Sequence, residues 1–350
     1  MTATEVVRLV LLIEGIALAG ILLTIFGYGA WSRAAETSRR RRLSSARAII
    51  AGRFESRQIP PADMAFLRGL PFGDQRRLLF EIATSVGQSE REWLRALARE
   101  LGVLDSTVAK TRVDQWWTRL WAARFLTLLD ADPVVMHPLF HDENPMVRAS
   151  AATYVAQHPT VEGIDALIAM LADPAMRCRL FAKDALMRLG SAATPTLLTR
   201  LANPDDAQTV SMLEVAGAIA TPEYLTTAVM HTADPRPGVR LLAARLLRGI
   251  SGPEAADHLT RLLGDTDGAV RIAAAEGIAF LNHWTASPAV LRLLDDPESR
   301  VRIAGAASLA QLGPAGELLL RRARSKGSER AALAASRVLD DPSRAESAAS

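Results

Sequence analysis

The chain has 350 residues, of which 49% are hydrophobic by type, 23% are charged and 5% are aromatic, with one cysteine and a formal net charge of +3. The charged fraction is close to that of an average folded domain, which excludes wholesale disorder. A single cysteine excludes a disulfide framework, and so small a net charge does not mark the whole chain as nucleic-acid-binding.

Residues 9–31 form a long apolar stretch in which Glu14 is the one ionisable residue. As a helix this stretch would be ~35 Å long, and a bilayer has a hydrocarbon core of ~30 Å. A cleaved signal peptide is the alternative, but the apolar run is longer than such signals have and no small-residue cleavage site follows it. We therefore predict an uncleaved transmembrane helix at 9–31, preceded by a short extracytoplasmic N-terminus at 1–8.

A basic segment at residues 32–53 follows the apolar stretch, whereas Arg8 is the one basic residue before it. The positive-inside rule then predicts a single-pass inner-membrane protein with its N-terminus outside and the rest of the chain in the cytoplasm. Four consecutive arginines are interpreted as a topology signal and as a contact with the anionic membrane surface: Arg39, Arg40, Arg41 and Arg42.

An ionisable residue within a membrane span often faces a partner helix, and two small residues four apart let helix backbones approach closely. Glu14, Gly15 and Ala19 fit both features. They predict a contact with another membrane helix or a second copy; the alternative is that Glu14 lies near the outer interface.

The distal part of the chain repeats with a period of 31 residues. A frame of the form D-P-x-x-x-V-R recurs, and its last position falls at 148, 179, 209, 240, 271 and 302, separated by 31, 30, 31, 31 and 31 residues. Such regular spacing indicates a repeat array. The frame residues are Asp142 and Arg148, Asp173 and Arg179, Asp234 and Arg240, Asp265 and Arg271, and Asp296 and Arg302, with a degenerate copy from Asn203 to Thr209.

Each repeat has the pattern of two helices. Apolar residues spaced four apart precede the frame Asp, and the Asp-Pro pair ends that first helix because proline disfavours the α region for the residue before it. Three residues after the frame Arg the side chain is usually small, as at Ala182, and seven after it the side chain is usually branched, as at Leu186. These two positions lie on one helix face and predict a close seam between neighbouring helices.

This frame, followed by A-A and an L-G stop, resembles the HEAT-repeat family in its short bacterial form, which is also seen in phycobilisome-lyase-type repeats. The resemblance covers residues 131–313. It implies an all-α fold, an α-solenoid of helical hairpins that binds other macromolecules. Irregular helical hairpins are expected at 43–130, a C-terminal capping hairpin at 314–340 and a disordered tail at 341–350.

The frame arginines form a ladder suited to carboxylates or phosphates, but pairing with the frame aspartates, in their own or a neighbouring repeat, is the favoured interpretation. Residues outside the frame remain as candidates for partner binding. Arginine and tryptophan are common interface anchors, although the tryptophans are explained as well by core packing. The candidates are Arg177, Arg245, Arg248, Arg300, Trp116 and Arg119.

No catalytic or cofactor motif is present, and Pro138 interrupts the helical spacing that His137 and His141 would need to share a metal. The sequence therefore predicts neither an enzyme nor a cofactor or metal site. It predicts a membrane-anchored scaffold whose cytoplasmic solenoid docks a membrane-associated protein, such as a membrane enzyme or export assembly. Two alternatives stay open: a nucleic-acid-binding HEAT-like protein, disfavoured by the acidic excess of residues 131–350, and a phycobilin-lyase-like enzyme.

Overall fold

The computed structural model describes the backbone of residues 3–202 and 206–341 and, within these ranges, all side chains except those of residues 3–19, 27, 29, 30, 206 and 207. All regular structure in this part of the chain is helical, which confirms the predicted all-α class. The chain forms two compact units, Met1–Asp132 and Pro133–Ser350, called unit 1 and unit 2 below.

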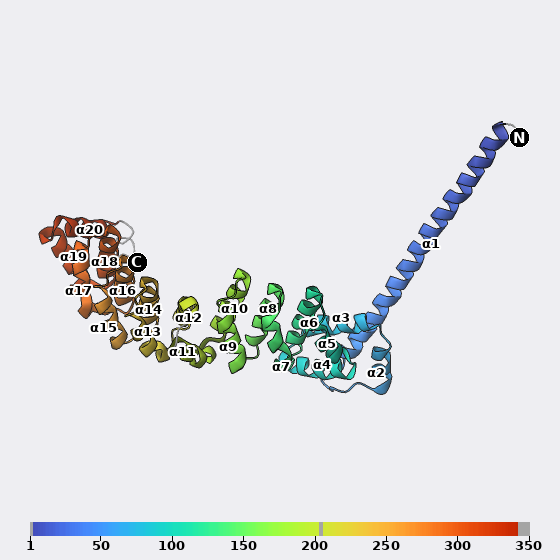
Figure 1. The fold of residues 1–350 in the computed structure, drawn as a ribbon, viewed down its shortest axis with the longest axis horizontal. Coiled ribbons are helices and arrows are strands. Elements are labelled where there is room, and N and C mark those ends of the chain that lie inside the picture. Colours follow the sequence, from blue (N-terminus) through green and yellow to red (C-terminus); the bar gives the residue numbers. More distant parts are fainter. Residues whose placement is uncertain (1–2, 203–205, 342–350) are drawn as a thin grey trace. The chain divides into compact units, whose positions relative to one another are not determined.

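Unit 1 begins with a single long helix whose last turns pack on the helices that follow it (Figure 1). In these last turns Ala46 and Ile50 are buried against the unit. The basic segment predicted at 32–53 is therefore largely a continuation of the first helix. The helices are α1 (Ala3–Ala51), α2 (Pro61–Arg68), α3 (Phe72–Ala83), α4 (Gln88–Glu100), α5 (Val103–Lys110) and α6 (Trp116–Leu128).

The predicted transmembrane helix at 9–31 and the predicted inner-membrane location are wrong. Among the helices the structure describes, none has an apolar stretch long enough to cross a bilayer. The side chains predicted to contact another membrane helix lie outside the described residues: Glu14, Gly15 and Ala19.

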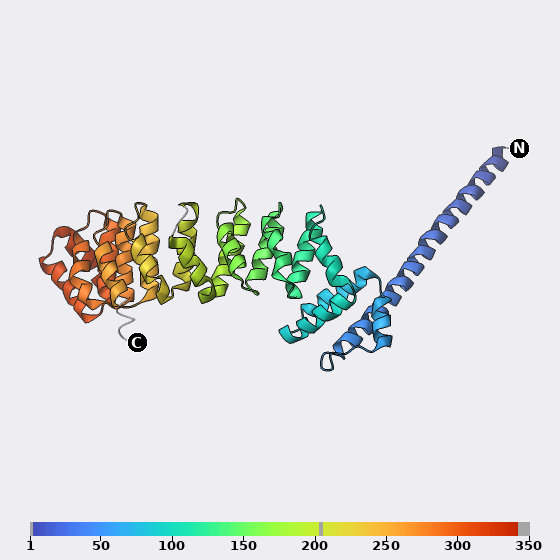
Figure 2. The ribbon, with the colours of Figure 1, turned by 60° about the horizontal axis from the view of Figure 1, so that its bottom comes forward.

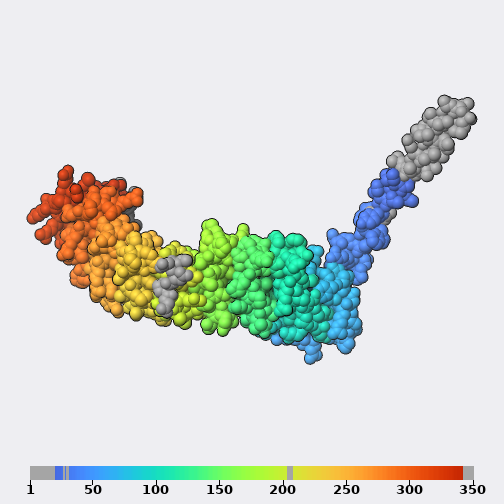
Figure 3. All heavy atoms as spheres, viewed as in Figure 1, coloured from blue at the N-terminus to red at the C-terminus, as the bar shows by residue number. Residues whose placement is uncertain are grey.

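Unit 2 consists of consecutive helical hairpins packed side by side (Figures 2 and 3). In each repeat the first helix lies in one layer and the second helix in the other (Figure 1). The elements are α7 (Pro133–Met136), η1 (His137–His141), α8 (Pro145–Val155), α9 (Val161–Met170), α10 (Met176–Leu189), η2 (Gly190–Ala193), α11 (Thr194–Ala202), α12 (Asp206–Ile219), η3 (Pro222–Tyr224), α13 (Leu225–His231), α14 (Pro237–Ile250), α15 (Pro253–Leu262), α16 (Gly268–Phe280), η4 (Trp284–Ala286), α17 (Ser287–Leu291), η5 (Arg292–Asp295), α18 (Ser299–Gln311), α19 (Pro314–Lys326) and α20 (Glu329–Leu339).

The repeat frame builds each hairpin locally. In the repeat of α9 and α10, the first helix ends at Met170, just before Asp173 and Pro174, and the second begins at Met176. The carboxylate of Asp173 accepts a hydrogen bond from the backbone N–H of Ala175 at 2.8 Å, which holds the turn between the helices. The turns at Asp142, Asp234, Asp265 and Asp296 have the same bond, to the residue two positions later.

The seam between second helices lies at the small and branched positions of the frame. Ala182 and Leu186 on α10 are fully buried, as are Ala243 and Leu247 on α14. Burying a leucine side chain contributes about 2 kcal/mol, and the alanine lets the neighbouring backbone come close enough to make that burial complete. We call α8, α10, α12, α14, α16 and α18 the second helices.

Candidate functional site

Three of the frame arginines bind the frame aspartate of the following repeat. Arg271 donates from Nε and Nη2 to the carboxylate of Asp296 at 2.8 and 2.9 Å, and its Nη1 donates to the backbone carbonyl of Asp265 at 2.8 Å. We call such a bidentate pair a clasp, because it joins one hairpin to the next. Two further clasps are present: Arg148 with Asp173, and Arg240 with Asp265.

The clasps keep their charges at neutral pH. Burial alone would raise the pKa of the Asp265 carboxyl, but hydrogen bonds from Arg240 and from the backbone N–H of Asp267 outweigh burial and lower the pKa below its ordinary value. The pKa of Asp173 is lowered in the same way against the effect of its burial. The hydrogen bond to Asp296 raises the pKa of Arg271. A guanidinium held so firmly is not available to a phosphate or carboxylate ligand.

Among the described residues, no carboxylate binds the frame arginine of α10. Arg179 donates from Nη1 only to the backbone carbonyls of Asp173 and Pro174, at 2.7 and 3.1 Å. In the sequence frame the next position for an aspartate is Asn203, which lies outside the described residues. Arg302, on the last frame repeat, likewise donates to backbone carbonyls of its own repeat.

The repeat of α12, which follows that of α10, also departs from the frame. Thr209 replaces the arginine and is fully buried. Asp234 instead pairs with Arg236 in its own turn, at 2.9 and 3.0 Å. The two repeats around α10 and α12 therefore differ from their neighbours in how they are held together.

The arginines predicted to bind a partner lie on different second helices, and the structure brings only two of them together. Arg177 is exposed on α10, and Arg300 is exposed on α18. Arg245 and Arg248 on α14 line a shallow pocket of about 290 Å³, and the Arg248 guanidinium lies over the ring of Phe280 with its carbon 4.5 Å from the ring centroid.

In unit 1, Trp116 and Arg119 lie at the start of α6. The ring of Trp116 is 39% exposed and meets the edge of the exposed Trp117 ring, with centroids 6.0 Å apart. Arg119 donates to the backbone carbonyls of Val113 and Asp114 at 2.9 and 2.7 Å. Trp121, in contrast, stacks on Phe125 with centroids 5.0 Å apart.

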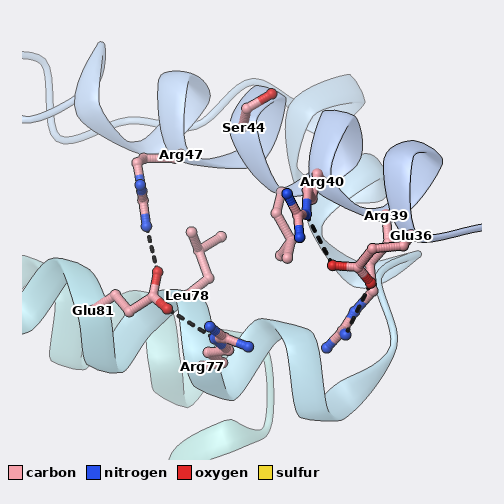
Figure 4. Close-up of a pocket in the computed structure, with 9 residues that line it drawn as sticks. Glu36, Arg39, Arg40, Ser44, Arg47, Arg77, Leu78 and Glu81 are labelled. Atoms are coloured by element: carbon pink, nitrogen blue, oxygen red, sulfur yellow. Dashed lines mark hydrogen bonds and ion pairs between the residues drawn. The ribbon is translucent and has the colours of Figure 1, made fainter. Parts of the chain in front are cut away.

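The arginine run of α1, residues 39–42, lies partly against α3 of the same unit. Arg39 binds Asp74 of α3 through Nε at 3.0 Å and lowers the pKa of that carboxyl, while Arg40 binds Glu36 at 3.0 Å. Figure 4 shows Arg47 and Arg77 both pointing toward Glu81, across a cleft of about 320 Å³ between α1 and α3. The pairs Arg39–Asp74 and Arg47–Glu81 join α1 to α3, and Arg41 and Arg42 are exposed. The structure gives no support to the predicted membrane-surface contact of the run.

Sequence reasoning missed a set of large apolar side chains that the second helices expose. Leu180 and Phe181 follow the frame Arg of α10 directly, and Val210 holds the equivalent place on α12. Their size could have indicated them, because the position that Leu180 holds on α10 is held in the first repeat by a small residue, the buried Ala149. Met187, near the end of α10, is also exposed.

The described metal-ligating and nucleophilic side chains do not gather into a metal or catalytic site. Across the described residues, no three His, Cys, Asp or Glu side chains are placed to hold a metal ion. Cys178 is fully buried at the frame valine position, its thiol donates to the carbonyl of Pro145 at 3.3 Å, and burial raises its pKa. It therefore packs as a small hydrophobic residue.

Comparison with known proteins identifies the repeats. A family model described as HEAT repeats matches residues 133–216 and 261–340. Among solved structures, the complex of CpcE and CpcF of phycocyanin lyase from Nostoc sp. PCC7120 is similar at 24% identity and a TM-score of 0.39, covering 43% of this chain and 99% of that one. No curated protein matches this chain.

Two further structures are similar over more of the chain. Kap121p shares 14% identity with a TM-score of 0.48, covering 83% of this chain and 39% of that one. Human deoxyhypusine hydroxylase shares 16% identity with a TM-score of 0.28, covering 87% of this chain and 97% of that one.

Proposed function

We propose that this HEAT-repeat protein is a scaffold that binds another protein through the exposed faces of its second helices. The observation that carries the proposal is the composition of those faces. They expose large apolar side chains, among them Leu180 at 54% and Phe280 at 60%, next to charges of both signs. Apolar anchors surrounded by mixed charge are typical of protein interfaces.

The charges on the second helices favour a protein over a nucleic acid. Lys183 binds Glu214 on the next second helix at 2.6 Å, and Arg245 lines the same pocket as Glu276. The clasps hold further arginines against aspartates. A phosphate backbone needs a continuous run of cations, whereas the described second helices carry basic side chains interspersed with acidic ones.

The proposal assigns binding and not catalysis to the chain. A mostly apolar cleft of about 310 Å³ in unit 2 is bordered by Met136, Phe140 and Tyr154. His137 and Glu162 also line it, but in the described part of the chain no hydrogen bond or ion pair joins these two side chains into an acid–base pair.

Crosslinking of the tagged full-length chain in its source cells, followed by mass spectrometry, tests the proposal. We expect recurrent crosslinks from second-helix residues to one protein. Crosslinks confined to a second copy, or a salt-dependent shift of duplex DNA or RNA by the purified chain, would overturn it. Leu318→Glu serves as a control variant, because Leu318 is 68% exposed on α19, which is not one of the second helices.

A further inference from the structure

One face of α10 carries a stripe of exposed apolar side chains. Met176 is 65% exposed, Leu180 54% and Met187 39%. Their spacing of four and seven residues puts all three on one face of the helix. Val210, at the position on α12 equivalent to Leu180, is 39% exposed. We call these four side chains the α10 patch.

The patch lies at the junction where the described residues show no clasp. Among consecutive second helices, α10 and α12 pack least closely. In the later repeats, the side chains at the position equivalent to Leu180 are equally large but half-buried: Leu241, Ile272 and Ile303. The looser packing therefore leaves apolar surface in solvent, which soluble proteins keep mainly where something binds.

Basic residues surround the patch. Along α10, helical geometry puts Arg177 and Arg188 on one side of the stripe and Arg179 on the other, and all three are exposed. The acidic neighbour Asp184 lies 4.0 Å from Arg188, and Lys183 is bound to Glu214. Basic side chains thus outnumber acidic ones on α10, although unit 2 as a whole carries an acidic excess.

We propose that the α10 patch binds an acidic amphipathic helix of a partner protein. The partner's apolar side chains, spaced three and four residues apart, would pack on Met176, Leu180 and Met187, and its carboxylates would pair with Arg177 and Arg188. Methionine suits such a surface because its unbranched, polarisable side chain adapts to the shape packed against it. This inference rests on the proposed scaffold function and names its binding face and the chemistry of its partner.

The test uses the full-length chain and two labelled synthetic peptides. Both are amphipathic helices with the same leucine face, one flanked by glutamates and the other by lysines. Fluorescence anisotropy measures their Kd values. We expect the glutamate peptide to bind at least about tenfold more tightly than the lysine peptide, and Leu180→Glu to weaken it about tenfold or more, as loss of a central anchor does.

Two variants make the test specific. Leu318→Glu is the matched control, because Leu318 on α19 is a leucine of similar exposure (68%) away from the patch, and it leaves binding unchanged. Arg177→Glu with Arg188→Glu reverses the preference between the two peptides. Thermal unfolding confirms that each variant is folded.

Equal affinity for both peptides, or binding that survives Leu180→Glu, would overturn the inference. So would self-association of the chain that Leu180→Glu abolishes in sedimentation, since the occupant would then be a second copy. If crosslinks to a protein partner come from other second helices while the glutamate peptide fails to bind, the inference fails and the scaffold function stands. If no protein partner is crosslinked at all, the scaffold function itself fails.

Discussion

The repeats of α14, α16 and α18 and the repeats of α10 and α12 have the same two-helix design but are joined differently. In the first group, Arg240 and Arg271 each clasp the aspartate of the next repeat. In the second group Arg179 has only backbone carbonyls as acceptors, the second helices pack least closely, and Leu180 and Val210 are exposed. The junction at which the described residues show no clasp is thus also the one where the second helices pack least closely and where Leu180 and Val210 are exposed.

Breaking a clasp has the largest expected effect. Asp265→Ala leaves the Arg240 guanidinium, whose side chain is 13% exposed, without its carboxylate. We expect a loss of about 3 kcal/mol in the free energy of unfolding, measured by urea denaturation of the full-length chain. The double variant Arg240→Met with Asp265→Leu should recover most of the loss, because it removes the uncompensated charge. A change below about 0.5 kcal/mol in the single variant would show that the clasp does not stabilise the array.

Acid should weaken the clasps at Asp173 and Asp265. The effect at each should be smaller than that of a substitution, because a protonated carboxyl can still form hydrogen bonds. The pKa values of Asp173 and Asp265 are lowered in the folded chain, so the folded state binds fewer protons than the unfolded state. The stabilisation is therefore present above the ordinary aspartate value of about 3.9 and is lost as the pH falls from there through the folded pKa values. Thermal unfolding from pH 7 to pH 2 measures it. Asp265→Asn should flatten the decline; an identical profile would contradict the assignment.

Replacing a frame arginine by methionine should destabilise the chain less where that arginine forms no clasp than where it does. Arg179→Met removes hydrogen bonds to two backbone carbonyls near solvent, so we expect a loss of about 1 kcal/mol. Arg271→Met is the comparison, because it leaves the buried carboxylate of Asp296 without its guanidinium. Thermal unfolding of both variants under one set of conditions gives the difference. Equal losses would mean that the carbonyl bonds, and not the clasp, account for the role of the frame arginine.

Supplying the missing aspartate should have the smallest effect, and its sign is opposite. By the sequence frame, Asn203→Asp restores the acidic position that follows Arg179. We expect a gain of about 0.5 kcal/mol, typical of a partly exposed ion pair. In an Arg179→Met background the gain should vanish. The substitution should also weaken binding of the glutamate peptide to the α10 patch, since a clasp there would neutralise Arg179, a basic neighbour of the patch.

Much of the repeat architecture could be predicted from single residues. Asp-Pro pairs such as Asp173-Pro174 end helices for local reasons, and the buried positions of Ala182 and Leu186 follow from helical periodicity alone. The first helix could not be predicted correctly. Its apolar stretch matches a membrane span in composition, but the helix continues to Ala51 and packs its end on α3, a contact with residues far along the chain.

The candidate binding residues were chosen for charge and aromaticity, and this selection missed Leu180 and Met187. A leucine next to the frame Arg is half-buried on α14, as Leu241, and exposed on α10, as Leu180, although the local sequence pattern is the same. The difference depends on how closely the next hairpin packs. No pattern within one helix contains that information.

Helix geometry and proline chemistry act over a few residues, so the period, the two-helix unit and the buried seam follow from local sequence alone. Only the tertiary structure decided which aspartate each arginine binds. Arg271 could have paired with Asp265 of its own repeat, six residues earlier, yet its Nε and Nη2 reach Asp296 in the next. The stacking distance between hairpins brings that carboxylate within reach, whereas the carboxylate of Asp265 is already held by the backbone of its own turn and by Arg240.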